Sequence, residues 1–117
     1  MPLRTSAGPE IFGPSPMRLL LSTCPAVHAE RIARALVDER VAACVNVVPG
    51  LVSIYRWKGE VMRDDEVLLV MKTRDDKLSA LREALRRVHP YDVPELVALS
   101  PTEVDELYAR WVDDETA

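Results

Sequence analysis

Leu19-Leu20-Leu21-Ser22-Thr23 returns fifty residues later as Leu69-Val70-Met71-Lys72-Thr73, an apolar run that ends on a threonine in both places. Each copy precedes a segment whose apolar residues recur at helical spacing, and each helical segment leads to another extended segment. Two such strand–helix–strand units in tandem are typical of the ferredoxin-like split βαβ arrangement. The repeat therefore predicts an α+β domain whose two helices pack on one face of a sheet.

The remaining elements are predicted from periodicity and turn residues. We expect strands at residues 17–23, 43–48, 66–73 and 95–99, and helices from Pro25 to residue 40, at residues 78–88 and at about residues 103–113. Pro49-Gly50 is expected to break the second strand, after which residues 51–57 are expected to continue extended and to pair with residues 60–62. Lys58-Gly59 is expected to form a tight turn, because glycine accepts the positive φ of hairpin turns. The resulting short hairpin is interpreted as an insertion between the two halves of the fold.

Length, composition and charge bound the class of protein. The chain has 117 residues, of which 48% are hydrophobic, and this fits one globular domain. Residues 1–16 hold four of the nine prolines and show no periodicity, so we interpret them as a disordered extension and place the folded domain at residues 17–114. A net charge of −4 offers no basic surface to nucleic acid or anionic lipid. The longest apolar runs, of about five residues, are too short for a membrane span, which needs ~20.

The two cysteines lie in different predicted elements and do not indicate a disulfide framework. No apolar secretory segment is visible in residues 1–16. We therefore expect a reducing, cytoplasmic location.

The apolar runs at residues 19–21 and 67–71 predict that the domain associates with copies of itself. If the sheet face opposite the helices met water, these strands would alternate apolar and polar residues, and they do not. About four to six large side chains would then remain exposed to water, and the free energy gained by burying them, about 6–18 kcal/mol, would be lost. That rivals the whole stability of a domain, about 5–15 kcal/mol. Another copy of the chain is the expected cover, and partial cover by the C-terminal segment is the alternative.

Several motifs in the right order resemble the CutA divalent-ion-tolerance family. They are Ala42-Ala43-Cys44-Val45-Asn46-Val47-Val48-Pro49-Gly50, Ser53-Ile54-Tyr55-Arg56-Trp57-Lys58-Gly59-Glu60-Val61, Lys72-Thr73, His89-Pro90-Tyr91 with Pro94-Glu95, and the aromatic pair Tyr108 and Trp111. The resemblance covers about residues 17–112. It implies a homotrimer of ferredoxin-like subunits, similar in architecture to the PII nitrogen-signalling proteins. It also implies a cytoplasmic role in tolerance to divalent metals, notably copper.

Cys44, His89 and Cys24 are the candidate metal ligands. Thiolate and imidazole groups suit copper(I) or zinc, but no Cys-x-x-Cys or His-x-x-x-His spacing accompanies them. We therefore expect no obligatory cofactor, with copper or another divalent ion as the candidate ligand. The alternative for Cys44 is a small buried strand residue, and for His89 a loop residue that ends a helix.

The loop at residues 89–95, stiffened by two prolines, is a second candidate site. In an assembly it would meet the aromatic residues of a neighbour's hairpin, which makes an inter-subunit cleft with aromatic walls and a Lys/Glu pair. Its candidate residues are Tyr55, Trp57, Lys72, Tyr91 and Glu95. The alternative is that the aromatic residues only anchor the interface and that Lys72–Glu95 is a structural tie.

Nothing in the sequence predicts an enzyme. The consecutive carboxylates Asp64-Asp65-Glu66 and Asp75-Asp76 are expected to be solvated, and glycine-rich phosphate loops and nucleophile motifs are missing. The leading hypothesis is a non-enzymatic trimer that binds metal ions. The runner-up is a PII-like sensor that binds a small anion or metabolite in its clefts and signals to a protein partner of unknown identity. The third hypothesis is an enzyme that uses Lys72, His89 and Glu95.

Overall fold

The computed structural model describes residues 16–117, so the extension predicted for residues 1–16 lies outside the described residues except for its last position. In chain order the elements are β1 (Met17–Cys24), α1 (Ala26–Asp38), β2 (Cys44–Trp57), β3 (Glu60–Arg74), a 3-10 turn (Asp75–Lys77), α2 (Leu78–Val88), β4 (Val97–Leu99) and α3 (Glu106–Glu115). No helix within this part of the chain combines the length and the apolar character needed to cross a bilayer.

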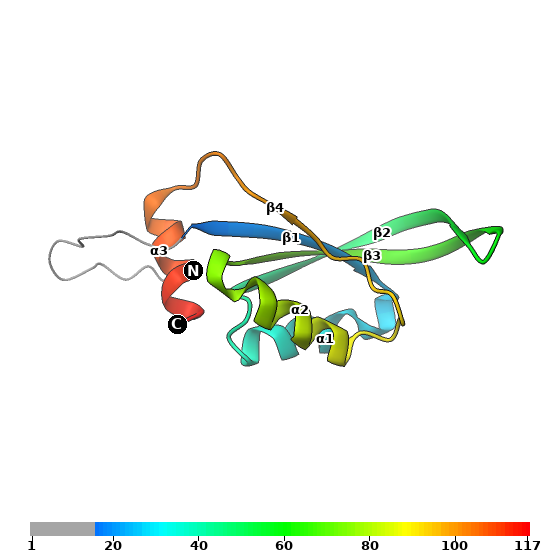
Figure 1. Cartoon of the computed structure of the whole chain (residues 1–117), viewed down its shortest axis with the longest axis horizontal. Helices are drawn as coiled ribbons and strands as arrows, with labels where there is room; N and C mark the ends of the chain where they lie inside the picture. The colour runs from blue at the N-terminus through cyan, green and yellow to red at the C-terminus, as the bar shows by residue number, and fades with distance from the viewer. Residues whose placement is uncertain (1–15) are drawn as a thin grey trace, which may run out of the picture.

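The four strands form one antiparallel sheet in the order β2-β3-β1-β4. The chain order β-α-β-β-α-β up to β4 is that of the ferredoxin-like fold. Helices α1 and α2 lie next to each other on one face of the sheet (Figure 1). The α+β fold predicted from the repeated pattern is confirmed.

The core lies between the sheet and helices α1 and α2. Successive residues of a strand point to opposite faces, and alternate residues of the central strands β1 and β3 point to the helices. Leu20 of β1 is paired with Met71 of β3, and both are fully buried there. The helices contribute the buried side chains of Ile32, Leu36, Leu81 and Leu85.

The segments predicted as separate strands and a short hairpin are two continuous strands, β2 and β3, which run beyond the sheet as a two-stranded hairpin (Figure 1). The predicted break at Pro49-Gly50 is wrong, because β2 continues through it with a register irregularity between Val48 and Leu51. Gly50 has a φ of 82° there, a value that glycine adopts at little cost. A bulge of this kind keeps a strand paired while it bends the strand. The hairpin is therefore a continuation of two sheet strands.

The C-terminal helix α3 begins at Glu106, a few residues later than predicted. Asp105 caps it, because its carboxylate accepts hydrogen bonds from the backbone N–H groups of Leu107 and Tyr108 at 3.1 and 3.2 Å. Strand β4 is also shorter than predicted and covers only Val97–Leu99. Helix α3 packs against β3 and β1.

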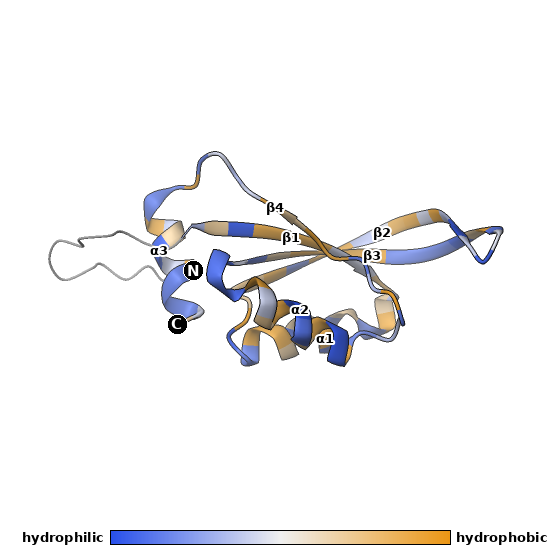
Figure 2. Cartoon of the chain, in the orientation of Figure 1, coloured by the Kyte–Doolittle hydropathy of each residue, from blue (hydrophilic) through white to orange (hydrophobic). Residues whose placement is uncertain are grey.

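The sheet face opposite α1 and α2, called the open face below, is apolar across β3, β1 and β4. Because paired residues share a face, the register assigns six apolar side chains to it: Leu19, Leu21, Leu68, Val70, Val97 and Leu99. Val97 and Leu99 are 47% and 44% exposed, and the other four are partly buried. Figure 2 shows hydrophobic residues along β1 and β4. The second apolar face predicted from the uninterrupted runs is therefore present.

Candidate functional site

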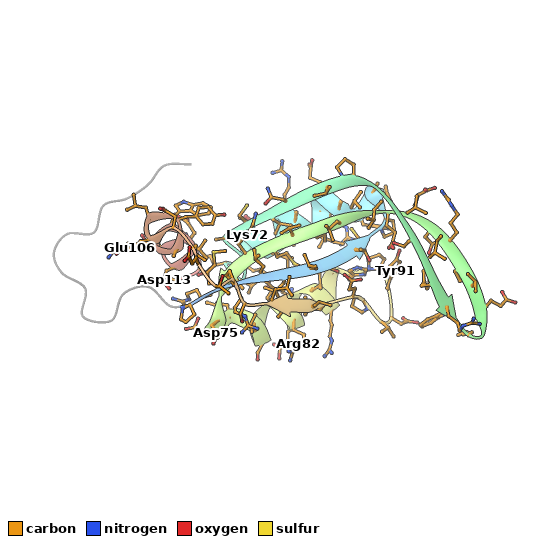
Figure 3. All side chains as sticks on the ribbon, turned by 90° about the horizontal axis from the view of Figure 1, so that it is seen from above. Lys72, Asp75, Arg82, Tyr91, Glu106 and Asp113 are labelled. Carbon is orange, nitrogen blue, oxygen red and sulfur yellow. The ribbon has the colours of Figure 1, made fainter. Side chains whose placement is uncertain are left out.

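The candidate residues lie in two places that are far apart along the sheet. Figure 3 shows Lys72 toward the end that carries α3, whereas Tyr91 lies toward the base of the β2–β3 hairpin. We call the first set the Cys44 group, which consists of Cys44, Asn46, Lys72 and Tyr108. We call the second the hairpin cavity, a hollow between the hairpin and the loop after α2.

The Cys44 group sits on the open face, where Cys44 of β2 pairs with Lys72 of β3. The half-buried thiol of Cys44 lies 3.9 Å from the Lys72 ammonium and 3.8 Å from the side-chain oxygen of Asn46. Lys72 Nζ also donates a hydrogen bond to that Asn46 oxygen. Burial, together with the nearby Cys44 thiol, raises the pKa of Tyr108 on α3. The group thus combines a soft sulfur donor, a cation and a phenol.

Cys24 occupies a different environment at the end of β1. Its side chain is fully buried in the core, facing the helices. Burial is the largest cause that raises the pKa of the Cys24 thiol. Glu66 raises it further, and Arg31 partly offsets the effect. A neutral thiol packed in an apolar core is a poor metal ligand, because the thiolate is the species that binds metals.

His89 fastens the loop after α2 to the end of β1. The residue is 7% exposed, and its Nε2 lies 2.8 Å from the carbonyl oxygen of Thr23. A carbonyl can only accept, so Nε2 carries the hydrogen, while Nδ1 accepts from the backbone N–H of Tyr91 at 3.1 Å. Both ring nitrogens are therefore engaged. His89 ends α2, as its alternative interpretation held, and its backbone N–H bonds to the Leu85 carbonyl.

The structure does not bring the three predicted metal ligands together in one subunit. Cys44 lies in the row of the sheet that contains Lys72 and Leu19. Cys24 lies at the opposite end of β1. His89 also lies there, because it is hydrogen-bonded to Thr23, the residue before Cys24. Within residues 16–117 no group of three or more His, Cys, Asp or Glu side chains could hold a metal ion.

The hairpin cavity gathers Tyr55, Trp57, Tyr91 and Glu95 within one chain, whereas the sequence placed the loop of one subunit against the hairpin of another. Its volume is about 740 Å³, and it is also lined by Thr23, Glu66 and Asp92. The hairpin curves over toward the segment that carries Tyr91 (Figure 3). The fifth predicted residue, Lys72, does not line it. Lys72 bonds to Asn46 instead of reaching Glu95, so Lys72, His89 and Glu95 do not form one catalytic group.

Two carboxylates that sequence reasoning assigned to solvent belong to this region. Asp64 and Glu66 are two residues apart in β3 and so share a face. Tyr55 donates a hydrogen bond to Asp64, and Tyr91 donates one to Glu66 at 2.7 Å. The prediction of a solvated Glu66 is wrong, because Glu66 is only 6% exposed. The strand alternation at residues 64–66 was the signal that could have identified this pair.

These contacts raise the pKa of two tyrosines. For Tyr91 the largest cause is burial, followed by the hydrogen bond to Glu66 and the negative charge of that carboxylate. For Tyr55 the hydrogen bond to Asp64 is the largest cause. In both cases a phenolate next to a carboxylate would be unfavourable, so the phenol keeps its proton.

The raised pKa of Tyr91 predicts a loss of stability at alkaline pH. The folded protein holds the Tyr91 proton more tightly than the unfolded chain, whose tyrosines titrate near pH 10. Stability from this contact is therefore complete below pH 10 and declines as the pH rises above it. Urea unfolding at neutral pH and at several values above pH 10 should show a shallower alkaline decline for Tyr91→Phe than for the wild type. Equal declines would contradict the prediction.

Comparison with known proteins places these features in a family. Residues 18–115 match the family described as CutA1 divalent ion tolerance protein. The chain is 50% identical over 99 residues to the divalent-cation tolerance protein CutA of Thermus thermophilus, which covers 84% of this chain and 96% of that protein. It is 42% identical over 102 residues to protein CutA of Homo sapiens, which covers 86% of this chain and 57% of the human protein. The chain thus spans little more than half of that longer relative.

Solved structures give the same result. The CutA1 structure from Thermus thermophilus has a TM-score of 0.83 at 48% identity and covers 86% of this chain and 99% of that one. A structure described as PII-like protein CutA from Nostoc sp. PCC 7120, in apo form, has a TM-score of 0.81 at 39% identity and covers 86% of this chain and 97% of that one. The likeness therefore extends over the described fold.

Proposed function

Because the chain belongs to the CutA1 divalent ion tolerance protein family, we propose that it works as a non-catalytic homotrimer in the cytoplasm. In this proposal it supports tolerance of divalent metal ions, copper among them, by binding the ion. The names of its relatives support the link to metal tolerance, and the PII-like neighbour supports a non-enzymatic role.

The observation that carries the proposal is the open face with Cys44 at its edge. Three neighbouring strands expose apolar side chains there, and copies of the chain that buried them would also enclose the Cys44 group, which lies on the same face. Sulfur ligands from several copies would then approach one another, which suits a soft ion such as copper(I). Association thus supplies what one subunit lacks, namely more than one donor.

Cys44 is the side chain expected to bind the metal. It is half-buried on the open face, whereas Cys24 is enclosed in the core and both nitrogens of His89 are engaged in hydrogen bonds. Among the three predicted ligands, Cys44 alone combines a soft donor with access from the open face.

Cys44→Ser is expected to remove most of the copper(I) affinity, because an alcohol replaces the soft sulfur donor. Isothermal titration with copper(I) under anaerobic, reducing conditions measures the effect. We expect the affinity to fall by at least about tenfold, a loss of 1.4 kcal/mol or more. Cys24→Ala is the matched control, because it removes a thiol from the core and should keep wild-type affinity. Equal affinities of wild type and Cys44→Ser would exclude Cys44 from the site.

A second candidate function is a PII-like sensor that holds a small ligand, and the hairpin cavity favours it. A hollow of about 740 Å³ with aromatic walls and a few polar groups has the composition and size of small-molecule sites. Native mass spectrometry of gently purified protein tests this candidate, since a sensor should retain a bound molecule that denaturation releases. Protein that carries metal but no organic ligand would favour the first candidate.

A further inference from the structure

We propose that the hairpin cavity binds a small organic cation, namely ammonium groups carried on a short aliphatic chain. The inference rests on the second candidate function, in which this cavity holds a small ligand, and it adds the chemical class of that ligand. It differs from the small anion or metabolite considered from the sequence, because Lys72, the positively charged residue expected in the cleft, lies elsewhere.

The charged residues that line the cavity are all acidic. Its lining includes the carboxylates of Glu66, Asp92 and Glu95, and no lysine, arginine or histidine is among its lining residues. Asp64, which is not among the lining residues, accepts the hydrogen bond of the lining residue Tyr55. An anion in this hollow would meet like charges, whereas a cation would be attracted by all of them.

Among the lining residues, Glu66 favours a cationic ligand most strongly. The residue lines the cavity and is more than nine-tenths buried, and Tyr91 donates a hydrogen bond to one of its two carboxylate oxygens. Among the ion pairs of the described residues, none includes Glu66. A buried charge is costly unless it is paired. An ammonium group in the cavity would provide the pairing charge and further hydrogen bonds.

The walls of the cavity suit an ammonium ion as well. Tyr55, Trp57 and Tyr91 present aromatic rings, whose faces attract cations electrostatically. The protein already places one ammonium near such a ring, since Lys58 Nζ lies 5.9 Å from the centre of the Trp57 ring. Aromatic faces also contact an aliphatic chain favourably, so they accept both parts of an alkylammonium ion.

An organic cation fits this cavity better than a metal ion. A volume of about 740 Å³ is that of a small-molecule site rather than of an ion site. The carboxylates are spread along the walls, and within residues 16–117 no three of them are close enough to ligate one ion. Charges spread in this way match a ligand whose ammonium groups are separated by several atoms.

The test compares three ligands that share a four-carbon chain and differ in charge. Isothermal titration of the assembled protein in phosphate buffer, free of amines, uses 1,4-diaminobutane, 1,4-butanediol and succinate. Trp57 fluorescence provides a second readout, with Trp57→Phe identifying its contribution beside Trp111. We expect binding of the diamine, which weakens as salt is added, and no binding of the diol or the dicarboxylate.

Glu66→Gln is the decisive variant, because it keeps the shape of the side chain and removes the charge. We expect the diamine affinity to fall about ten- to a hundredfold, the usual effect of losing a charged hydrogen-bonding partner. Glu83→Gln, an exposed change of the same chemistry on α2, should bind like the wild type. If Glu66→Gln fails to fold, the exposed Glu95→Gln replaces it, with a smaller loss expected.

The possible outcomes distinguish a failure of this inference from a failure of the small-ligand sensor function on which it rests. Tighter binding of succinate than of the diamine would overturn the inference and leave the small-ligand sensor standing. Binding of the diamine with equal affinity by Glu66→Gln, Glu95→Gln and wild type would also overturn the inference. Binding of none of the three ligands would overturn it too, while the sensor candidate is judged separately by what native mass spectrometry finds on the purified protein.

Discussion

Val70→Asp is expected to convert the proposed homotrimer into monomers. Val70 lies in β3 on the open face, between Leu21 of β1 and Asn46 of β2. In a monomer the new carboxylate would face water, but in an assembly it would be buried without a partner, at a cost of several kcal/mol per copy. Each 1.4 kcal/mol changes an association constant about tenfold. Light scattering during size-exclusion chromatography should therefore show three subunits for the wild type and one for the variant.

Val27→Asp is the matched control for this experiment. Val27 is 83% exposed near the start of α1, on the helix layer that covers the other side of the sheet. The same charge is introduced there without a change to the open face, so the mass should stay that of the wild type. A wild type that is monomeric at micromolar concentration would refute self-association. A Val70→Asp protein of unchanged mass would show that the open face is not the interface.

Leu69→Ala is expected to reduce the free energy of unfolding by about 2–5 kcal/mol, because it leaves a cavity in the core. Leu69 precedes Val70 in the same strand, yet its side chain points to α1 and α2 and is fully buried. Denaturant unfolding at one fixed protein concentration measures the effect, since association also contributes to apparent stability.

The pair of variants separates the two faces of β3. Leu69→Ala should keep the mass of the wild type, whereas Val70→Asp should change it. Val27→Ala, a truncation of an exposed side chain, should alter stability by no more than about 0.5 kcal/mol. A loss below about 1 kcal/mol for Leu69→Ala would show that this residue does not belong to the tightly packed core.

The fold was predictable because its signals are local. Apolar runs at residues 19–21 and 67–71 mark the two central strands, and helical spacing marks the two helices that cover them. The same runs indicated a second apolar face. Strand alternation places Leu20 and Met71 on one face of the sheet, and Leu19 and Val70 on the other. The continuation of β2 through Pro49-Gly50 was missed because the same residue types occur at the end of a strand and at a bulge within a strand.

The candidate site was predictable only in part. The sequence indicated a cleft between two subunits, whereas the hairpin cavity gathers Tyr55, Trp57, Tyr91 and Glu95 within one chain. The predicted grouping of Lys72 with Glu95 is not observed. It was based on strand order, which does not specify the row of the sheet that each residue occupies. Lys72 is in the row of Leu19 and Leu99, and Glu95 lies beyond the other end of β4.

From the sequence alone came the alternation of the strands, the two apolar faces and the motifs shared with the family, all of which depend on residues near one another in the chain. Tertiary structure decided which distant groups meet: Tyr91 with Glu66, Tyr55 with Asp64, and His89 with Thr23. The physical reason is that such contacts depend on strand register and on the bend of β2 at residues 48–51, and neither is encoded in any single local motif.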